Sequence, residues 1–338
     1  VCVALVACTM VASAQLQLQD GDVVAFVGGG DLVGIQQDGR LEAALTEATR
    51  AGAPRFRDLA WEGDTVYFQN AVRERWRTDA FGGWREQLDR LGATVLLLQF
   101  GKMESFDGVG RLEDFVSTYG ELIDALSDGK RRVVLLSPVP FAWPAADDRA
   151  ALPEYRAAIE ALARKRELTF VPCDDREPVG GFVRSLTGAP VPEGAAFEVL
   201  RANVREKHRL WMEYWRPANW KCIFGDDSER IFSKASHGLP SIQDEWATYP
   251  QLVAGVETAI YEERRWNAPD PPKRTGSAEA DIAKELAAFE VLEGFTVNLF
   301  AEESDGITTP LSVRWDARGR MYVACSDVYP QIEPGVRG

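Results

Sequence analysis

The residues of this chain that are best placed for chemistry come directly after short apolar runs. Gly28-Gly29-Gly30-Asp31 closes the run Val23–Val27, and this order is typical of a strand followed by a tight turn at the start of an open α/β sheet. Such sheets bind ligands outside the carboxyl ends of their strands. We therefore expect Gly28–Asp31 to form one wall of any active site, although this wall carries no side-chain nucleophile.

Carboxylates and aromatic rings occupy the predicted strand-end loops. Paired carboxylates can bind a cation or perform acid–base chemistry, but solvated loop carboxylates are the favoured interpretation here. The acidic candidates are Asp31, Asp58, Asp64 and Glu104. The rings could form a cleft that stacks on sugars, or could pack as core or lid, and both interpretations stay open. These rings are Trp61, Phe106, Phe141 and Trp143.

Nucleophiles and bases are scarce near the predicted strand ends. Ser105 and Ser137 each follow a strand, but no histidine accompanies either one, so we interpret them as turn or cap serines. The chain has only two histidines. His208 lies within a predicted helix among charged residues, which favours a solvated or helix-face role. His237 lies in an irregular segment and is the candidate base that could fold over the sheet edge.

Nucleotide binding at the glycine turn is a further hypothesis, with Asp58 as the acceptor for a ribose hydroxyl. The spacing of Gly28, Gly30 and Gly34 does not match the G-x-G-x-x-G fingerprint of dinucleotide-binding folds. We rank this hypothesis last.

Alternating strands and helices must position these residues. The predicted strands are Val23–Val27, Arg55–Ala60, Ala93–Phe100, Arg132–Leu136 and Leu168–Pro172. The predicted helices are Leu41–Thr49, a region Val66–Leu91 broken near Gly82-Gly83, Leu112–Leu126, Pro153–Lys165, Ala195–Trp215 and Gln251–Arg265. This alternation predicts a flavodoxin-like three-layer α/β/α sandwich with about five parallel strands.

Composition excludes some classes of function. The 338 residues are 46% hydrophobic, which supports a substantial core, and the net charge of −14 argues against nucleic acid as a partner. Beyond the first residues the cysteines are Cys173, Cys222 and Cys325, with no CxxC pair, so no zinc or haem site is encoded. We expect no metal or cofactor, and three buried free thiols unless one disulfide forms.

The first residues indicate export. Residues 1–14 are typical of the apolar region of a signal peptide without its basic start, and Ala12-Ser13-Ala14 fits a cleavage site. Leu5-Val6-Ala7-Cys8 also fits a lipobox, so lipoprotein processing is an alternative, and a buried first strand is another. The stretch is too short to span a bilayer, which needs about 20 residues. We expect a periplasmic or extracellular protein without a transmembrane segment once the signal is removed.

The carboxyl-terminal part has a different composition. Residues 266–278 are rich in proline and polar residues and are predicted to be a linker. Residues 279–338 contain two alternating runs, Phe295–Phe300 and Met321–Cys325, with a turn at Asp316–Arg320 before the second. This all-β fragment is predicted to be the opening of a domain cut off at Gly338.

Three blocks in a fixed order resemble the SGNH (GDSL-type) hydrolase family. They are the glycine turn after the first strand, Trp61–Thr65, and Phe100–Phe106. The resemblance covers about Asp22–Tyr261, within the domain predicted at residues 21–265. It is greatest to a branch at the front of large exported bacterial proteins, in which a β-propeller of the membrane-bound dehydrogenase type and a c-type haem domain follow. Trp211–Trp220 and the propeller-like start Phe289–Pro330 also fit that branch.

The resemblance also implies which groups are missing. The family's nucleophilic serine corresponds to Gly30, and its oxyanion-hole asparagine corresponds to Met103, while Gly63 matches the oxyanion-hole glycine. Its Asp-x-x-His pair has no match, because no histidine accompanies Asp174 and Asp175. Acyl transfer needs an activated nucleophile and donors aimed at the oxyanion, so no residue can be named as catalytic.

These observations predict a catalytically degenerate member of an esterase family that acts as a carbohydrate-binding or structural module. The expected partners are a carbohydrate or acylated carbohydrate and the propeller domain in cis. The expected binding residues lie at the strand ends and are Gly28, Gly29, Asp31, Trp61, Asp64, Gly101 and Glu104. The alternative is an active carbohydrate esterase that uses displaced groups, Ser105 or Ser137 with His237.

Overall fold

The structure, a computed structural model, describes residues 16–142, 150–236, 238–270, 272, 282–302, 305–307 and 310–325. Its main feature is a five-stranded sheet in the order β2-β1-β3-β4-β5, with every neighbouring pair parallel. The strands are β1 (Val23–Gly28), β2 (Arg55–Asp58), β3 (Val95–Gln99), β4 (Arg132–Leu136) and β5 (Thr169–Val171). The predicted five-stranded parallel sheet is confirmed.

The two interior strands β1 and β3 are buried along their whole length. Every residue of both is buried, as expected for parallel strands covered on both faces, and only Gln99 at the end of β3 has a polar side chain. In register, Val24 lies opposite Phe56 of β2 and opposite Val95 of β3. The run of β-branched and aromatic residues that ends at the glycine turn is therefore an interior strand of the sheet, not an edge strand.

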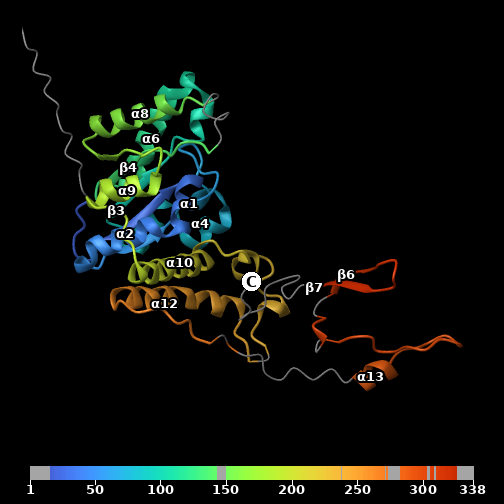
Figure 1. Cartoon of the computed structure of the whole chain (residues 1–338). Helices are drawn as coiled ribbons and strands as arrows, with labels where there is room; N and C mark the ends of the chain where they lie inside the picture. Colours follow the sequence, from blue (N-terminus) through green and yellow to red (C-terminus); the bar gives the residue numbers. More distant parts are fainter. Residues whose placement is uncertain are drawn as a thin grey trace, which may run out of the picture. The chain divides into compact units, whose positions relative to one another are not determined.

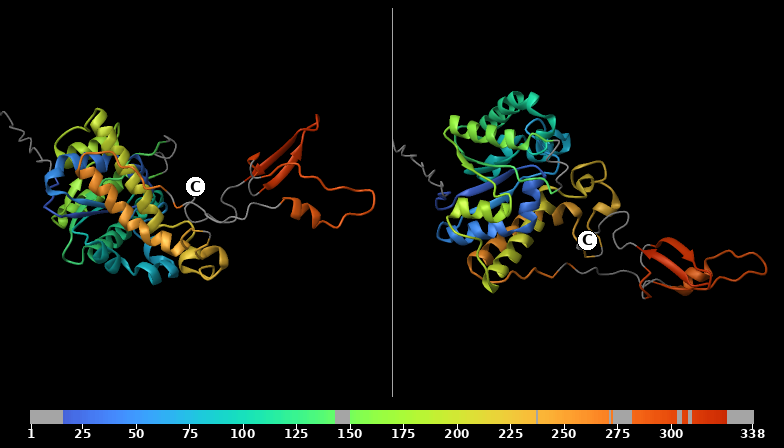
Figure 2. Two further views of the ribbon diagram at one scale, coloured as in Figure 1. Left: turned by 90° about the horizontal axis from the view of Figure 1, so that it is seen from below. Right: turned by 45° about the horizontal axis from the view of Figure 1, so that its top comes forward.

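Helices cover both faces of the sheet, and Figures 1 and 2 show the resulting three layers. Helices α5 (Trp84–Leu91), α6 (Leu112–Ser127) and α8 (Leu152–Lys165) pack together on one face. Helices α1 (Gly30–Asp38), α2 (Arg40–Thr49), α9 (Pro178–Thr187) and α10 (Ala195–Trp215) pack together on the other. Two shorter helices, α3 (Asn70–Arg73) and α4 (Arg75–Phe81), precede α5. The predicted α/β/α sandwich is thus confirmed.

Several helix predictions need correction. Helices α1 and α9 were not predicted, because each contains two glycines that weaken the helical pattern. Helix α12 (Ile242–Tyr261) begins nine residues before the predicted Gln251. The reason is Pro250, which lies inside the helix although proline normally marks a helix boundary. Figure 1 shows α12 running beside α10, and Asn203 of α10 donates to the carbonyl of Arg264 at 2.8 Å.

The chain divides into two compact units. The first contains residues 1–215 and 250–267 and includes the sheet, and the second contains residues 216–249 and 268–338. In the second unit, α11 (Trp220–Phe224) supplies Cys222 and Ile223 to a small apolar cluster with Ile242. Residues 266–270 and 272, which are the described part of the predicted linker, form neither helix nor strand.

The carboxyl-terminal segment contains the predicted strand Met321–Cys325, in a small antiparallel sheet whose other strand was not predicted. Strand β7 (Met321–Cys325) pairs with β6 (Pro310–Trp315) across the predicted turn, where the N–H of Gly319 donates to the carbonyl of Asp316 at 3.0 Å. The predicted strand Phe295–Phe300 is wrong, because these residues form no ladder and Phe300 is 80% exposed. A short helix, α13 (Ile282–Ala287), was also not predicted.

Two sequence expectations concern targeting and thiols. The predicted signal segment lies outside the described residues, and no helix within them has the length and apolar character needed to cross a membrane. Three cysteines are free: Cys222 is buried, Cys173 is half-buried and Cys325 is exposed. The expectation of three buried thiols is therefore wrong for Cys325, because β7 has no layer packed on either face in the described chain.

Candidate functional site

The glycine turn after β1 is shaped by close backbone approach. A Cβ atom on Gly28 would lie 2.5 Å from the carbonyl oxygen of Gln99, and one on Gly29 would lie 2.7 Å from that of Asp64. Both contacts are shorter than real Cβ contacts, so only glycine fits at these two positions. The turn therefore packs the end of β1 directly against the end of β3 and the loop after β2.

Gly30 differs from its two neighbours. It is exposed at the first position of α1, and apart from its chain neighbours and its own helix backbone, no atom of the described residues lies within 4 Å of the place where its Cβ would be. Gly63 is likewise exposed and has open space around its Cβ position, with φ at +79°. Met103 is 53% exposed. The positions that the family resemblance assigns to nucleophile and oxyanion hole are thus open to solvent and carry no reactive group.

Gly28→Ala is expected to lower the free energy of unfolding by about 1–3 kcal/mol, because the new methyl group would overlap the Gln99 carbonyl. Gly30→Ala is the matched control and should change stability by less than about 0.5 kcal/mol. Urea unfolding followed by circular dichroism measures both. Equal losses in the two variants would contradict the packing role assigned to Gly28.

Asp31 and Lys102 form an ion pair across the strand ends. Lys102 Nζ lies 2.7 Å from Asp31 Oδ1 and also donates to the carbonyl of Pro140 at 3.1 Å, and the N–H of Val139 donates to Asp31 Oδ2 at 3.2 Å. Burial raises the pKa of Asp31, although Lys102 and the Val139 N–H oppose the shift. The carboxylate thereby connects the loops that follow β1, β3 and β4.

Lys102→Met should leave the half-buried Asp31 carboxylate without its cation and lower stability at pH 7 by about 1–3 kcal/mol. The loss of stability should become smaller as the pH falls. A carboxyl group whose pKa is raised by folding favours the folded state most when protonated, and its contribution disappears as pH rises through the folded pKa. Unfolding measured between pH 4 and pH 7 on the single variant and on Lys102→Met/Asp31→Asn tests this, since the second change should recover most of the loss. An unchanged loss in the double variant would contradict it.

The other strand-end carboxylates also accept hydrogen bonds from the strand-end loops. Glu104 is buried, and its two oxygens accept the N–H groups of Val66 at 2.8 Å and Gly101 at 2.9 Å. Burial raises the pKa of Glu104, and these N–H groups oppose the shift. Asp64 Oδ1 accepts both the backbone N–H and the side-chain amide of Asn70, at 2.9 and 2.6 Å. Among the described residues, no three His, Cys, Asp or Glu side chains gather so as to hold a metal ion.

The hydroxyl and thiol groups near the strand ends are not activated. Ser105 is fully buried and its Oγ donates to the carbonyl of Lys102 at 2.6 Å. Ser137 is also buried, and its Oγ donates to the carbonyl of Pro138 at 3.3 Å. Burial raises the pKa of the Cys173 thiol, which follows β5, to about 11. Each of these groups is therefore a poor nucleophile at neutral pH.

The candidate bases are the two histidines. His208 is on α10, with Nδ1 3.4 Å from Oδ2 of Asp58, and Asp58 also accepts the N–H of Ala60 at 2.8 Å. The Asp58 carboxylate is buried against this helix, so it does not offer a surface for a ribose hydroxyl. His237 lies outside the described residues. The acidic residues after β5 are in ion pairs, Asp174 with Arg184 at 2.7 Å and Asp175 with Arg156 at 2.8 Å.

The strand-end rings separate into two groups. Phe106 and Phe141 lie with their ring centroids 4.9 Å apart, and Phe106 is 43% exposed. Lys102 Nζ lies 5.0 Å from the centroid of the Phe141 ring. Trp61 instead packs edge-to-face on the buried Trp215, with centroids 5.6 Å apart. Trp143 lies outside the described residues. The geometry thus places an aromatic pair, of which Phe106 is exposed and Phe141 is half-buried, beside the Lys102–Asp31 ion pair.

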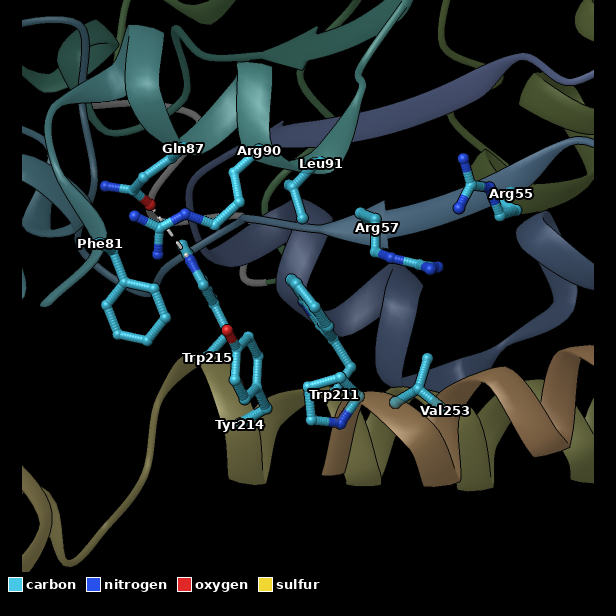
Figure 3. A pocket seen from close by; sticks show the side chains of 11 residues that line it. Arg55, Arg57, Phe81, Gln87, Arg90, Leu91, Trp211, Tyr214, Trp215 and Val253 are labelled. Atoms are coloured by element: carbon cyan, nitrogen blue, oxygen red, sulfur yellow. Dashed lines mark hydrogen bonds between the residues drawn. The ribbon is translucent and has the colours of Figure 1, made fainter. Parts of the chain in front are cut away.

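A concave feature beside β2 was not predicted from the sequence. A cavity of about 210 Å³ lies between this strand and helices α5, α10 and α12, as Figure 3 shows. Its walls combine aromatic and cationic residues: Arg55, Arg57, Phe81, Gln87, Arg90, Leu91, Trp211, Tyr214, Trp215, Pro250 and Val253. These residues are spread over about 200 positions of sequence, so no local motif could have revealed them.

Comparisons with known proteins add the following. The family model described as "Domain of unknown function (DUF7133)" matches residues 281–337. No curated protein matches the chain in sequence. Among solved structures, the chain is similar to LAE5, an alpha/beta hydrolase enzyme from the metagenome of Lake Arreo, Spain, at 18% identity and a TM-score of 0.34, covering 47% of this chain and 81% of that one.

Two further solved structures are similar. One is a GDSL-like lipase from Bacteroides thetaiotaomicron, at 18% identity and a TM-score of 0.30, covering 45% of this chain and 68% of that one. The other is Axe2, an acetylxylan esterase from Geobacillus stearothermophilus, at 13% identity and a TM-score of 0.32, covering 46% of this chain and 78% of that one. Similarities of this size assign no activity or substrate to the present chain.

Proposed function

We propose that this chain contains an SGNH-hydrolase-like domain that has lost acyl-transfer chemistry and serves as a carbohydrate-binding or structural module of an exported multidomain protein. The observation that carries the proposal is Gly30. It lies at the start of α1, directly after the interior strand β1, where the sequence resemblance places the nucleophile. It has no side chain, and apart from its chain neighbours and its own helix backbone, no atom of the described residues lies within 4 Å of its Cβ position.

The surroundings of Gly30 support the same proposal. Acyl transfer requires a nucleophile, a base and donors for the oxyanion in one place. Met103 supplies no donor, and the nearest acidic side chain in sequence, Asp31, is held by Lys102 and Val139. The alternative esterase with displaced groups is disfavoured, because the hydroxyls of Ser105 and Ser137 both face backbone carbonyl oxygens.

A binding role is favoured by the strand-end rings. The exposed Phe106 and the half-buried Phe141 present aromatic surface next to the Lys102–Asp31 ion pair, a combination that suits a sugar ring with an acylated substituent. The export signal and the propeller in cis belong to this proposal as well, and they rest on the sequence patterns of residues 1–14 and 279–338.

Hydrolysis of aryl acetates and acetylated xylo-oligosaccharides by the purified chain tests the proposal. We expect no turnover above the buffer rate for the chain itself. Gly30→Ser should also stay inactive, because the open space at this position accepts a hydroxyl group, but no histidine of the described residues lies within 4 Å of the Cβ position to serve as its base. Serine-type turnover by the unmodified chain would overturn the proposal.

A further inference from the structure

The cavity beside β2 has rigid aromatic walls. The ring centroid of Tyr214 lies 5.7 Å from that of Phe81 and 5.6 Å from that of Trp211. Trp211 Nε1 donates to the carbonyl of Asp58 at 2.5 Å, and Trp215 Nε1 donates to Oε1 of Gln87 at 3.2 Å. Figure 3 shows these α10 rings facing β2 and α5 across the cavity. Because the indole N–H groups are used internally, the walls offer apolar ring surfaces whose positions are already fixed.

The same cavity carries an excess of positive charge. Its lining contains three arginines and no acidic residue. Arg57 is neutralised by Glu257 of α12, through contacts of 2.5 and 3.2 Å that hold the pKa of Glu257 below its ordinary value despite burial. Arg55 and Arg90 are exposed at the cavity, and Arg90 Nη1 reaches a neutral group, the Ala80 carbonyl, at 3.3 Å. Two guanidinium groups thus exceed the local carboxylates on a chain whose net charge is −14.

The size and polarity of the cavity limit which class of ligand it can bind. A volume of about 210 Å³ leaves room for a small ring. Guanidinium groups match carboxylates in bidentate geometry, and aromatic faces favour a flat apolar surface. Gln87 adds no further donor, because its amide N–H groups already donate to the carbonyls of Ala71 and Gly82 at 2.8 and 2.9 Å.

We propose that the cavity between β2, α5, α10 and α12 binds a small carboxylate attached to a ring, with Arg90 on the carboxylate and the Trp211 and Tyr214 rings against the ring face. Figure 3 shows Arg55 at the other end of the cavity from Arg90. This site is separate from the Gly30 edge, and it does not depend on the function proposed above. A sugar acid and an aromatic acid share the required chemistry.

Isothermal titration of the whole chain with benzoate, D-galacturonate, D-galactose and inorganic phosphate tests the site. We expect one equivalent of benzoate or of galacturonate to bind, and the acid that binds shows whether the ligand is an aromatic acid or a sugar acid. Galactose lacks the charge and phosphate lacks the ring, so neither should bind as well. Arg90→Gln should weaken binding about tenfold or more, since a hydrogen bond to a charged group is lost. Arg85→Gln on the same helix, where Arg85 pairs with Asp128 at 2.7 Å, is the matched control and should bind as the unmodified chain does.

Three results would overturn this site. The first is the absence of carboxylate binding at millimolar concentration. The second is equal affinity in Arg90→Gln and in the unmodified chain. The third is phosphate binding as tight as that of either ring acid, which would indicate a general anion site. Arg90 is exposed, so the variant should fold, and circular dichroism checks this. Ester hydrolysis is measured separately, so failure here leaves the proposed function to be judged by its own assay.

Discussion

Lys207→Met is expected to lower the free energy of unfolding by about 3–5 kcal/mol, because it would leave a buried carboxylate without its cation. Lys207 of α10 is 3% exposed and Glu42 of α2 is 4% exposed, and the Lys207 ammonium group donates to the Glu42 carboxylate. The same ammonium group donates to the carbonyl of Phe56 in β2 at 3.1 Å. One charge pair therefore joins two helices to the edge strand.

The double variant Lys207→Met/Glu42→Met separates the pair from simple packing. Burial raises the pKa of Glu42, while Lys207 opposes that shift, so the cost of the single change is the cost of an unpaired buried charge. Replacing both partners with apolar groups should recover most of the lost stability. Guanidinium unfolding measures both variants, and a double variant as unstable as Lys207→Met would refute the charge-pair explanation.

Trp215→Ala should lower the free energy of unfolding by a similar amount, about 3–5 kcal/mol, because it removes a large buried side chain. Trp215 is 2% exposed, its ring lies against Trp61, and the Arg77 guanidinium group lies 4.7 Å from its centroid. Its carbonyl also accepts a hydrogen bond from the side chain of Arg77.

Trp215→Phe is the matched variant for this site. It keeps an aromatic ring against Trp61 but removes the N–H group that bonds Gln87, so its loss should be about 1–2 kcal/mol. Thermal and guanidinium unfolding, with near-ultraviolet circular dichroism to follow the aromatic cluster, give the comparison. A loss below about 1 kcal/mol for Trp215→Ala would show that this ring is not a core element.

The sheet could be predicted from sequence because its signals are local. Each of the five predicted strands overlaps an observed one, and β4 has the predicted bounds, because buried parallel strands are continuous apolar runs. The convergence of the strand-end loops follows from that topology alone. Helix α1 was missed because Gly30 and Gly34 dilute its apolar pattern, and the run Phe295–Phe300 was overestimated because alternation alone does not supply a pairing partner.

The candidate site could be predicted only in part. The sequence identifies Gly30 as a position without a nucleophile, but not that Gly28 and Gly29 are fixed by the carbonyl groups of Gln99 and Asp64. It identifies Asp31 as a strand-end carboxylate, but not its pairing with Lys102, which lies 71 residues away in the chain. Such contacts depend on how far each loop reaches over the sheet edge, and residue types do not encode that reach.

The central claim is that the chain carries no serine-type acyl-transfer site, and covalent labelling tests it most directly. The purified chain is treated with a fluorophosphonate, and intact mass is measured alongside hydrolysis of an aryl acetate. We predict no mass increase and no hydrolysis above the buffer rate, both for the unmodified chain and for Gly30→Ser, because no histidine of the described residues lies within 4 Å of the Gly30 Cβ position. A stoichiometric adduct on the unmodified chain, with loss of measurable turnover on labelling, would contradict the claim.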